Sequence, residues 1–476
     1  MAHVGSPDTF FGGKAGPYDV RVSVRLPGVI PGRAQVTVRV EGVAAANTHH
    51  VTVRAGQWNV GLKGAPPAET ATPVPGDPSL FASELWFMTA QPYELAVGVD
   101  GPSGKGEVLV PVLALATAEK PMAPWLGGVL AALGIFLTAG MLTIIGAAVR
   151  ESALPPGTEP DRKRRVRARI GMAAAALVAA LVLWGGNAWW GAEASEYSRF
   201  TLYRPFNATA AVGDGGRTLA LGIRDPRWTG KPYPQSMYNA LMPDHGKLMH
   251  LFVVSKELVA FAHLHPVART PQALDFDTQL PPLPPGNYHV YADIVHESGY
   301  AQTLVSTIDV PGDRFEAVPS DPDDSWFVGG AAPESPAAAF WLADGAQVIW
   351  DRGADPIVAG KDRDLKFAVR DAAGADLSVE PYMGMAAHLV VASMDGSVFA
   401  HLHPSGSISM AAMQRFVVPS GSGSADAHVG HAMADLSGRV AIPYAFPKPG
   451  GYRLFAQVKR GGTVETAAFG VTVQAR

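Results

Sequence analysis

Short runs in which apolar and polar residues alternate dominate the first 120 residues of the chain. Examples are Tyr18–Val24 (YDVRVSV), Gln35–Val40 (QVTVRV) and Tyr93–Val99 (YELAVGV). A period of two is typical of β-strands that bury one face, and Gly and Pro separate these runs as they separate the strands of antiparallel sheets. The pattern predicts a β-sandwich over residues 1–120, with the proline-rich stretch Lys63–Leu80 as a long loop.

Two long apolar runs follow. Trp125–Val149 and Ile170–Trp190 contain no charged residue, and each is long enough to cross a hydrocarbon core of about 30 Å as a helix. Buried helices of soluble proteins are usually shorter, and tryptophans stand at the ends of both runs, as they do at membrane interfaces. The sequence therefore predicts transmembrane helices at residues 125–149 and 170–190, with the lipid bilayer as a partner.

The connecting segment, residues 150–169, carries seven Lys and Arg residues against three Asp and Glu residues. The positive-inside rule places such a loop in the cytoplasm, so both flanking regions are expected in the periplasm of a bacterial inner membrane. Export of an N-terminal domain needs a signal peptide, and the opening MAHVGSPDTFF has neither a basic nor an apolar region of that kind. A signal is therefore expected either upstream of this start or removed from it.

The remainder of the chain contains an internal repeat. His245–Pro266 (HGKLMHLFVVSKELVAFAHLHP) aligns without a gap with Met383–Pro404 (MGMAAHLVVASMDGSVFAHLHP), and Pro285–Val310 also matches Pro449–Val473. Self-similarity of this kind indicates duplicated domains. We expect homologous periplasmic β domains at residues 192–312 (the first repeat) and 313–476 (the second repeat). The Pro- and Asp-rich stretch Val318–Ala339 is expected to be a linker between them.

Composition agrees with a mainly β chain. Charged residues make up 17% of its 476 residues, below the globular average of about 25%, and it contains 52 glycines and 40 prolines. This balance disfavours a soluble helical bundle. The predicted fold is three immunoglobulin-like or cupredoxin-like β-sandwich domains with two transmembrane α-helices.

The same histidine spacing, H-x12-H-x-H-P, occurs in both repeats. It comprises His250, His263 and His265 in the first repeat and His388, His401 and His403 in the second. Asp395-Gly396 is a strong signal for a two-residue hairpin turn, which would place Val390 opposite His401 and His388 opposite His403. Because side chains alternate along a strand, the three imidazoles of each repeat are expected on one face, close enough to bind one metal ion.

A further aligned position precedes the first of these histidines by five residues. It is His245 in the first repeat and Met383 in the second, and both side chains can ligate soft or borderline metals. The chain has no cysteine, which excludes thiolate sites, iron–sulfur clusters and blue copper centres. Copper is therefore the expected ion, with zinc as the alternative. The competing interpretation is a polar core network that only rigidifies the hairpins.

Four other histidines of the repeat region stand outside this spacing. His428 and His431 lie in a Gly- and Ser-rich insertion and could be either ligands or solvated loop residues. His289 and His296 align with Arg453 and Arg460, so they are expected at the surface or as an elaboration of one site.

Two segments resemble known bacterial families. GPYDVRVSVRLPGVIPGRAQVTVRV, residues 16–40, resembles the YtkA-like and FixH-like β-sandwich domains of bacterial membrane proteins. PYMGMAAHLVVASMDGSVFAHLHPSGSISMAA, residues 381–412, resembles a motif of uncharacterised bacterial envelope proteins, and a sandwich with His and Met ligands is similar in kind to copper carriers of the CopC type. These resemblances imply metal handling or assembly of membrane redox complexes, with copper on the six histidines of the repeated spacing.

The sequence favours binding over catalysis. A net charge of −4 argues against nucleic acid as a partner, and the chain shows no P-loop, dinucleotide fingerprint or hydrolase motif. We expect a membrane-tethered periplasmic protein that binds and handles a transition metal. The alternative is a non-catalytic envelope scaffold or assembly factor for a protein partner, such as a membrane redox complex, and a weaker one is a copper-dependent oxidoreductase.

Overall fold

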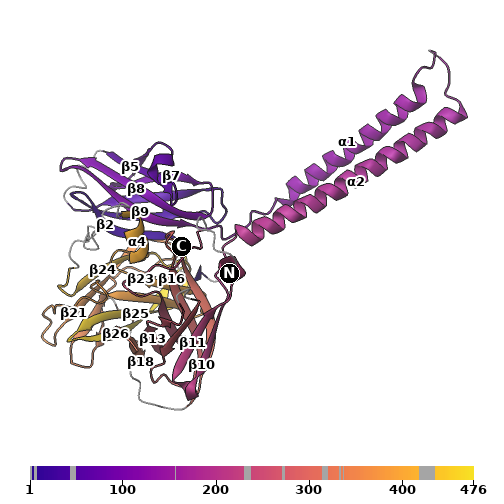
Figure 1. The fold of residues 1–476 in the computed structure, drawn as a ribbon. Helices are drawn as coiled ribbons and strands as arrows, with labels where there is room; N and C mark the ends of the chain where they lie inside the picture. The colour runs from indigo at the N-terminus through magenta and orange to yellow at the C-terminus, as the bar shows by residue number, and fades with distance from the viewer. Residues whose placement is uncertain are drawn as a thin grey trace. The chain divides into compact units, whose positions relative to one another are not determined.

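The computed structural model describes residues 3–4, 8–42, 50–155, 157–229, 237–270, 274–312, 320–331, 334–335, 337–417 and 435–476 (Figure 1). His428, His431 and the predicted domain boundary at residue 313 lie outside these residues. Two compact units are present: Met1–Leu115 with Arg204–Arg476, and Ala116–Tyr203.

The smaller unit is a pair of long helices, α1 (Pro124–Glu151) and α2 (Arg162–Phe200), which run side by side (Figure 1). Both predicted spans are therefore helical, and both helices are long and apolar enough to cross a membrane. Asp161 caps α2 by accepting a hydrogen bond from the backbone N–H of Arg164 at 2.7 Å. Most basic residues of the predicted connecting loop lie in the first turns of α2.

The N-terminal region forms one eight-stranded sheet with the order β2-β3-β4-β7-β6-β5-β8-β9. Its elements are Thr9–Ala15 (β2), Tyr18–Arg25 (β3), Gly32–Val40 (β4), His50–Gln57 (β5), Leu62–Gly64 (η2, a 3-10 turn), Glu69–Val74 (β6), Asp77–Phe87 (β7), Gln91–Gly101 (β8) and Gly104–Ala114 (β9). The edge strands β2 and β9 lie against each other, and the Tyr18 hydroxyl donates to the Gly104 carbonyl at 3.0 Å. The predicted two-sheet sandwich is thus a single sheet folded onto itself.

The proline-rich stretch Lys63–Leu80 is not the long loop that its composition predicted. It contains β6 and the start of β7. Pro73 stands at an irregularity of the β6–β7 pairing, between Pro73 and Val74. A proline is tolerated there because its missing N–H costs no regular ladder hydrogen bond.

Each repeat contributes a four-stranded and a five-stranded sheet. In the first repeat the orders are β10-β11-β15-β14 and β17-β16-β12-β13-β18. These elements are Ala208–Gly213 (β10), Asp214–Gly216 (η3), Thr218–Ile223 (β11), Pro226–Thr229 (α3), His250–Ser255 (β12), Ala260–Leu264 (β13), Val267–Ala268 (β14), Asp275–Gln279 (β15), Gly286–Val295 (β16), Ala301–Val310 (β17) and Ser325–Val328 (β18). Leu251 and Val253 of β12 pack with Leu219 and Leu221 of β11 in the core between the two sheets.

The second repeat follows the same plan, with the orders β19-β20-β21-β24 and β1-β23-β22-β25-β26. Its elements are His3–Val4 (β1), Ala337–Trp341 (β19), Gln347–Asp351 (β20), Arg363–Arg370 (β21), His388–Ser393 (β22), Val398–Leu402 (β23), Met410–Val417 (α4), Arg439–Tyr444 (β24), Gly450–Arg460 (β25) and Thr463–Val473 (β26). Leu389 and Val391 of β22 pack with Leu365 of β21 in a core of its own.

The two five-stranded sheets also pack against each other. Phe261 stacks on Phe455 with ring centroids 4.5 Å apart, and Tyr291 stacks on Phe399 at 4.0 Å. These residues belong to one buried cluster drawn from both repeats. The repeats are therefore four successive sheets with a shared central core, and three separate sandwich domains are not evident.

The predicted linker Val318–Ala339 is partly regular. Its β18 strand pairs with β13 in the sheet of the first repeat, with Ala260 opposite Val328 and His263 opposite Ser325. Because His263 pairs with Ser325, the Asp-rich segment that precedes β18, Asp321–Asp324, lies near the end of β13.

Candidate metal centre

The repeated histidines lie on two equivalent hairpins, β12–β13 and β22–β23. Val390 is opposite His401, as the Asp395-Gly396 turn predicted, and Phe252 is correspondingly opposite His263. Gly396 closes the turn with φ +68°, and its N–H donates to the Ser393 carbonyl at 3.0 Å. A left-handed conformation of this kind favours glycine.

Both faces of these strands are buried. All six residues of β12 and all six of β22 are buried. Leu251 and Val253 point into the core of the first repeat, whereas Phe252 and Val254 belong to the central cluster between the repeats. Because side chains alternate, His250 lies on the same face as Phe252 and points to the interface between the repeats.

Seven histidines therefore meet at this interface. We call them the histidine centre: His245, His250, His263, His265, His388, His401 and His403. Ring centroids of the first repeat lie close to those of the second, at 5.5 Å for His250 and His401 and 6.1 Å for His263 and His388. Phe252 closes one side of the centre, with its ring 4.3 Å from that of His263.

In the first repeat, two imidazoles face each other through nitrogen atoms. His250 Nδ1 and His263 Nε2 are 3.1 Å apart. The other nitrogen of each ring lies against an oxygen: His250 Nε2 is 3.1 Å from the Asp244 carbonyl, and His263 Nδ1 is 2.9 Å from Gln457 Oε1. Both oxygens are carbonyl oxygens and can only accept, so His250 Nε2 and His263 Nδ1 carry the protons.

This protonation leaves two lone pairs facing each other. A neutral imidazole has one N–H, and burial lowers the pKa of both His250 and His263 well below the ordinary value, so both rings are neutral. His250 Nδ1 and His263 Nε2 then have no proton to share. Two nitrogen ligands of one tetrahedral ion, each about 2.0–2.1 Å from it, are separated by a little over 3 Å. The observed spacing fits that arrangement.

The second repeat has the same contacts. His388 Nδ1 lies 3.1 Å from His401 Nε2, and His388 Nε2 donates to the Tyr382 carbonyl at 3.2 Å. His401 Nδ1 is 3.3 Å from Asp293 Oδ2, so an ionised Asp293 leaves His401 Nε2 without a proton. Burial raises the pKa of Asp293 to about 7, which means that both of its forms are populated near neutral pH.

The third histidine of each repeat is held by Nδ1 and has a free Nε2. His265 Nδ1 donates to Asp324 Oδ1 at 3.0 Å, and His403 Nδ1 donates to the Ile408 carbonyl at 3.3 Å. Nε2 of His245, His265 and His403 is buried and has no hydrogen-bond partner among the described residues. A metal-ligating histidine usually donates one ring N–H to an oxygen and binds the ion through its other nitrogen.

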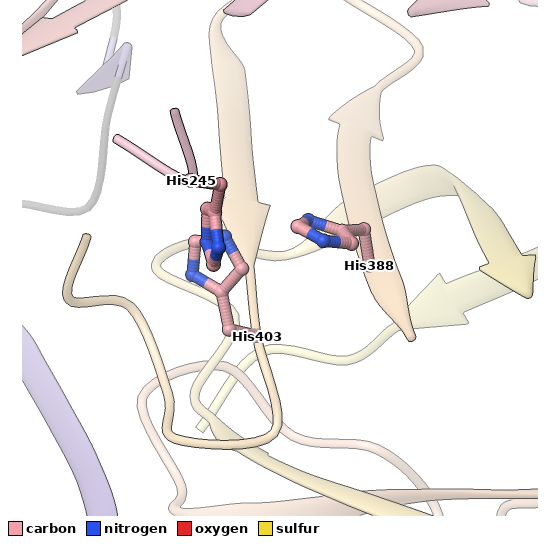
Figure 2. A group of neighbouring side chains, drawn as sticks. All are labelled: His245, His388 and His403. Carbon is pink, nitrogen blue, oxygen red and sulfur yellow. The ribbon is translucent and has the colours of Figure 1, made fainter. Parts of the chain in front are cut away.

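Two sets of three histidines place their ligand atoms within 4.8 Å of one another. One set is His250, His263 and His265; the other is His245, His388 and His403, shown in Figure 2. His245 thus groups with histidines of the other repeat, whereas the sequence had suggested a place beside its own. Met383 occupies the corresponding position in the second repeat and is half-buried. His265, Asp321 and Asp324 form a third group of the same size.

Several residues of the centre were not anticipated from the sequence. Asp324 lies in the predicted linker, and Tyr382 donates its hydroxyl proton to the Asp323 carbonyl at 3.0 Å while its oxygen lies 3.1 Å from His263 Nδ1. Asp293 and Gln457, by contrast, occupy aligned positions in the repeat. This alignment could have indicated both residues, because Asp293 contacts His401 and Gln457 contacts His263, the central histidine of the other repeat in each case.

His296 is not a surface residue, contrary to the expectation from its alignment with Arg460. It is fully buried among Phe206, Trp228, Tyr238 and Tyr300, and its Nδ1 donates to the Asn239 carbonyl at 2.6 Å. It takes no part in the histidine centre. His289 is half-buried, and Met410 and Met413 are buried.

One family model matches parts of both repeats. Residues 230–312 and 341–475 match a family described as Domain of unknown function (DUF8832). No curated protein matches the chain.

Similarities to solved structures are weak. The FN1–FN3 domains of chicken CNTN1 are 9% identical, with 95% of this chain and 97% of that one covered and a TM-score of 0.15. A marsupial T cell receptor is 8% identical, with coverage of 96% and 99% and a TM-score of 0.14. A Salmonella alpha-2-macroglobulin variant is 10% identical, with coverage of 99% and 23% and a TM-score of 0.20. None of these similarities carries a functional argument.

Proposed function

We propose that this chain is a membrane-anchored periplasmic protein that binds transition-metal ions through the histidine centre. The observation that carries the proposal is the facing pair His250 Nδ1 and His263 Nε2, 3.1 Å apart and both unprotonated. A cation between these atoms would satisfy both lone pairs. It would also be within reach of the unpartnered Nε2 of His265.

The energetic balance favours this interpretation over a purely structural polar network. A buried polar atom without a partner costs about 1–3 kcal/mol, so networks that serve rigidity satisfy each of their members. Here the Nε2 atoms of three buried or half-buried histidines lack a hydrogen-bond partner among the described residues. Metal ligation would satisfy all three.

The donor set points to copper, with zinc as the alternative. The ligands on offer are imidazole nitrogens and one thioether, because the chain has no cysteine. Imidazole suits both ions, whereas a thioether favours Cu(I). Asp324 behind His265 and Asp293 behind His401 supply negative charge close to the ligands.

The membrane location rests on α1 and α2 and on the basic residues between them. The positive-inside rule places the connecting segment in the cytoplasm and both β-rich regions in the periplasm. Within this proposal we interpret each repeat as a β-sandwich of immunoglobulin-like or cupredoxin-like type.

The test is a metal titration of the full chain in detergent micelles. Cu(I), Cu(II) and Zn(II) are each titrated in competition with a chromophoric chelator, for the wild type and for the double variant His265→Ala/His403→Ala. We expect tight binding of at least one ion by the wild type and its loss in the double variant. His50→Ala, on the exposed part of β5, controls for surface binding. His296→Ala controls for the loss of a buried histidine outside the centre. Equal, weak binding in every protein would refute the proposal and leave the scaffold alternative.

A further inference from the structure

We infer that the histidine centre holds two ions and that each takes a fourth ligand from the opposite repeat: His245 for the ion of the second repeat, Met383 for the ion of the first. The inference rests on the proposed metal binding. It makes the two sites chemically different, although the six other ligands are equivalent.

His245 reaches across the interface. Its ring centroid lies 5.2 Å from those of both His388 and His403, compared with 5.9 Å from that of His250 in its own repeat. Figure 2 shows the His245 ring beside that of His403, with His388 close by. His245 has φ +52°, at the tip of a tight turn in which the Asp244 and Lys247 backbones exchange hydrogen bonds of 2.8 and 2.9 Å.

The turn that carries Met383 has the same geometry. Met383 has φ +49°, and the Tyr382 and Met385 backbones exchange hydrogen bonds of 2.8 and 3.0 Å. Both turns also precede equivalent carbonyl contacts: Asp244 accepts from His250 and Tyr382 accepts from His388. Because the two turns are equivalent, we expect Met383 to lie beside His250 and His265 as His245 lies beside His388 and His403.

Each turn is fixed to the opposite repeat. Asp244, next to His245, accepts a hydrogen bond from the backbone N–H of Ala411 in α4 at 2.7 Å. Tyr382, next to Met383, contacts His263 through its hydroxyl. The two turns thus bring their ligands to the partner hairpin by independent contacts.

The two sites are adjacent, and carboxylates line both. Rings of the two inferred sites lie as close as 5.5 Å, for His250 and His401. Two bound cations so near each other need compensating negative charge in a buried setting. Asp324 contacts the His265 ring and Asp293 contacts the His401 ring, each at Nδ1.

A change from imidazole to thioether alters metal preference. Zn(II) favours nitrogen over a thioether, whereas Cu(I) accepts both. The wild type should therefore bind two Cu(I) ions of similar affinity but two Zn(II) ions of unequal affinity, with the weaker zinc site next to Met383.

Exchanging the two residues tests this assignment directly in the full chain in detergent. Met383→His should strengthen the weaker Zn(II) site by about ten-fold or more, and His245→Met should weaken the stronger one by a similar factor. Both replacements are suited to their turns, because each residue type already occupies that backbone conformation in this chain. As a control, Met394→His adds an imidazole at the exposed turn between β22 and β23. It should leave both Zn(II) dissociation constants unchanged.

The outcomes separate this inference from the proposed function. If the protein binds metal but neither Met383→His nor His245→Met alters the Zn(II) dissociation constants, the assignment of these ligands across the interface is wrong. The proposed metal centre would then still hold. A single equivalent of Cu(I) would overturn the two-ion arrangement. Absence of binding in the wild type would refute the proposed function itself.

Discussion

His263 in the first repeat donates through Nδ1 to Gln457 Oε1 in the second repeat, at 2.9 Å. The equivalent histidine, His401, contacts Asp293 of the first repeat at 3.3 Å. The orientation of each central imidazole is therefore set by a side chain of the opposite repeat. Neither repeat orients its own central histidine, so the histidine centre depends on the interface between the repeats.

Weakening that interface should reduce both stability and metal affinity. Phe252→Ala removes a fully buried ring that stacks on His263, and large-to-small changes of this kind cost about 3–5 kcal/mol. We expect a loss of that size in urea unfolding, together with weaker metal binding in the competition titration. Phe469→Ala, in the second repeat's own core, should cost similar stability without changing affinity. Equal losses of affinity in both variants would show that the interface has no special role.

The Asp324 carboxylate, which contacts His265 Nδ1, should increase the metal affinity of the centre. Asp324 accepts from His265 Nδ1 at 3.0 Å and from the His265 backbone N–H at 2.8 Å. Replacing a carboxylate that accepts a hydrogen bond from a metal-ligating histidine usually costs about 10–100-fold in metal affinity, and we expect about that loss for Asp324→Asn. Asp323→Asn is the matched control, because the Asp323 side chain pairs with Lys459 at 2.9 Å and does not touch the ring. Unchanged affinity in Asp324→Asn would contradict the assigned role.

The metal-free protein should lose stability as the pH falls through 6.5. Burial lowers the pKa of the half-buried His289 and lowers further those of six other histidines: His250, His263, His296, His388, His401 and His403. The folded chain keeps them neutral while the unfolded chain protonates them, so protons favour the unfolded state below about pH 6.5. From pH 7.5 to 5.5, His296 and His403, whose pKa values burial lowers to about 4 and about 3, each contribute a loss of about 1.4 kcal/mol, and the other histidines act in the same direction. For His403, whose pKa burial lowers to about 3, this protonation difference persists down to about that pH.

Asp293 acts in the opposite sense. Its pKa is raised to about 7, so the folded state takes up a proton that the unfolded state does not, which offsets about 2 kcal/mol over the same range. The net expectation is a decrease in the free energy of unfolding from pH 7.5 to pH 5.5, measured by urea denaturation at both pH values, because several buried histidines outweigh one carboxylate. In His296→Phe, the free energy of unfolding should fall less between the two pH values, by the contribution of that one histidine. A free energy of unfolding that does not change with pH would mean that these histidines are not buried as neutral rings.

The orientation in the membrane can be tested with single cysteines, since the natural chain has none. Ala68→Cys lies on an exposed part of the N-terminal region and Thr158→Cys lies on the exposed segment between α1 and α2. In spheroplasts, a membrane-impermeant maleimide should label Ala68→Cys at once and Thr158→Cys only after lysis. The reverse pattern would place the β-rich regions in the cytoplasm.

Much of the local geometry of the centre could be predicted from the sequence. The Asp395-Gly396 turn and strand alternation together predicted the register of the hairpin, and the pairing of Val390 with His401 confirms it. The equal spacing in the first repeat then predicted the equivalent pairing of Phe252 with His263. These features depend on contacts within about twenty residues, which turn chemistry and side-chain periodicity determine.

The sequence pattern did not predict that the two hairpins meet at one interface. Alternation places the histidines on one face but does not say whether that face meets the core of its own repeat, solvent or another sheet. A clue was present: His250–Ser255 (HLFVVS) is apolar on both faces after its first residue, which is typical of a strand buried on both sides. The places of Asp324 and His296 depend on the course of distant segments, which no local pattern specifies.

The contacts between histidines of one repeat and side chains of the other also have a consequence for the origin of the chain. A single ancestral repeat could have assembled this centre only as a homodimer, in which symmetry makes every residue occur twice. Duplication and fusion into one chain removed that constraint, since each position could then change in one copy alone. The pairs His245 with Met383 and Asp293 with Gln457 are differences of this kind. Covalent linkage thus gave the protein access to an asymmetric centre that no self-associating ancestor could encode.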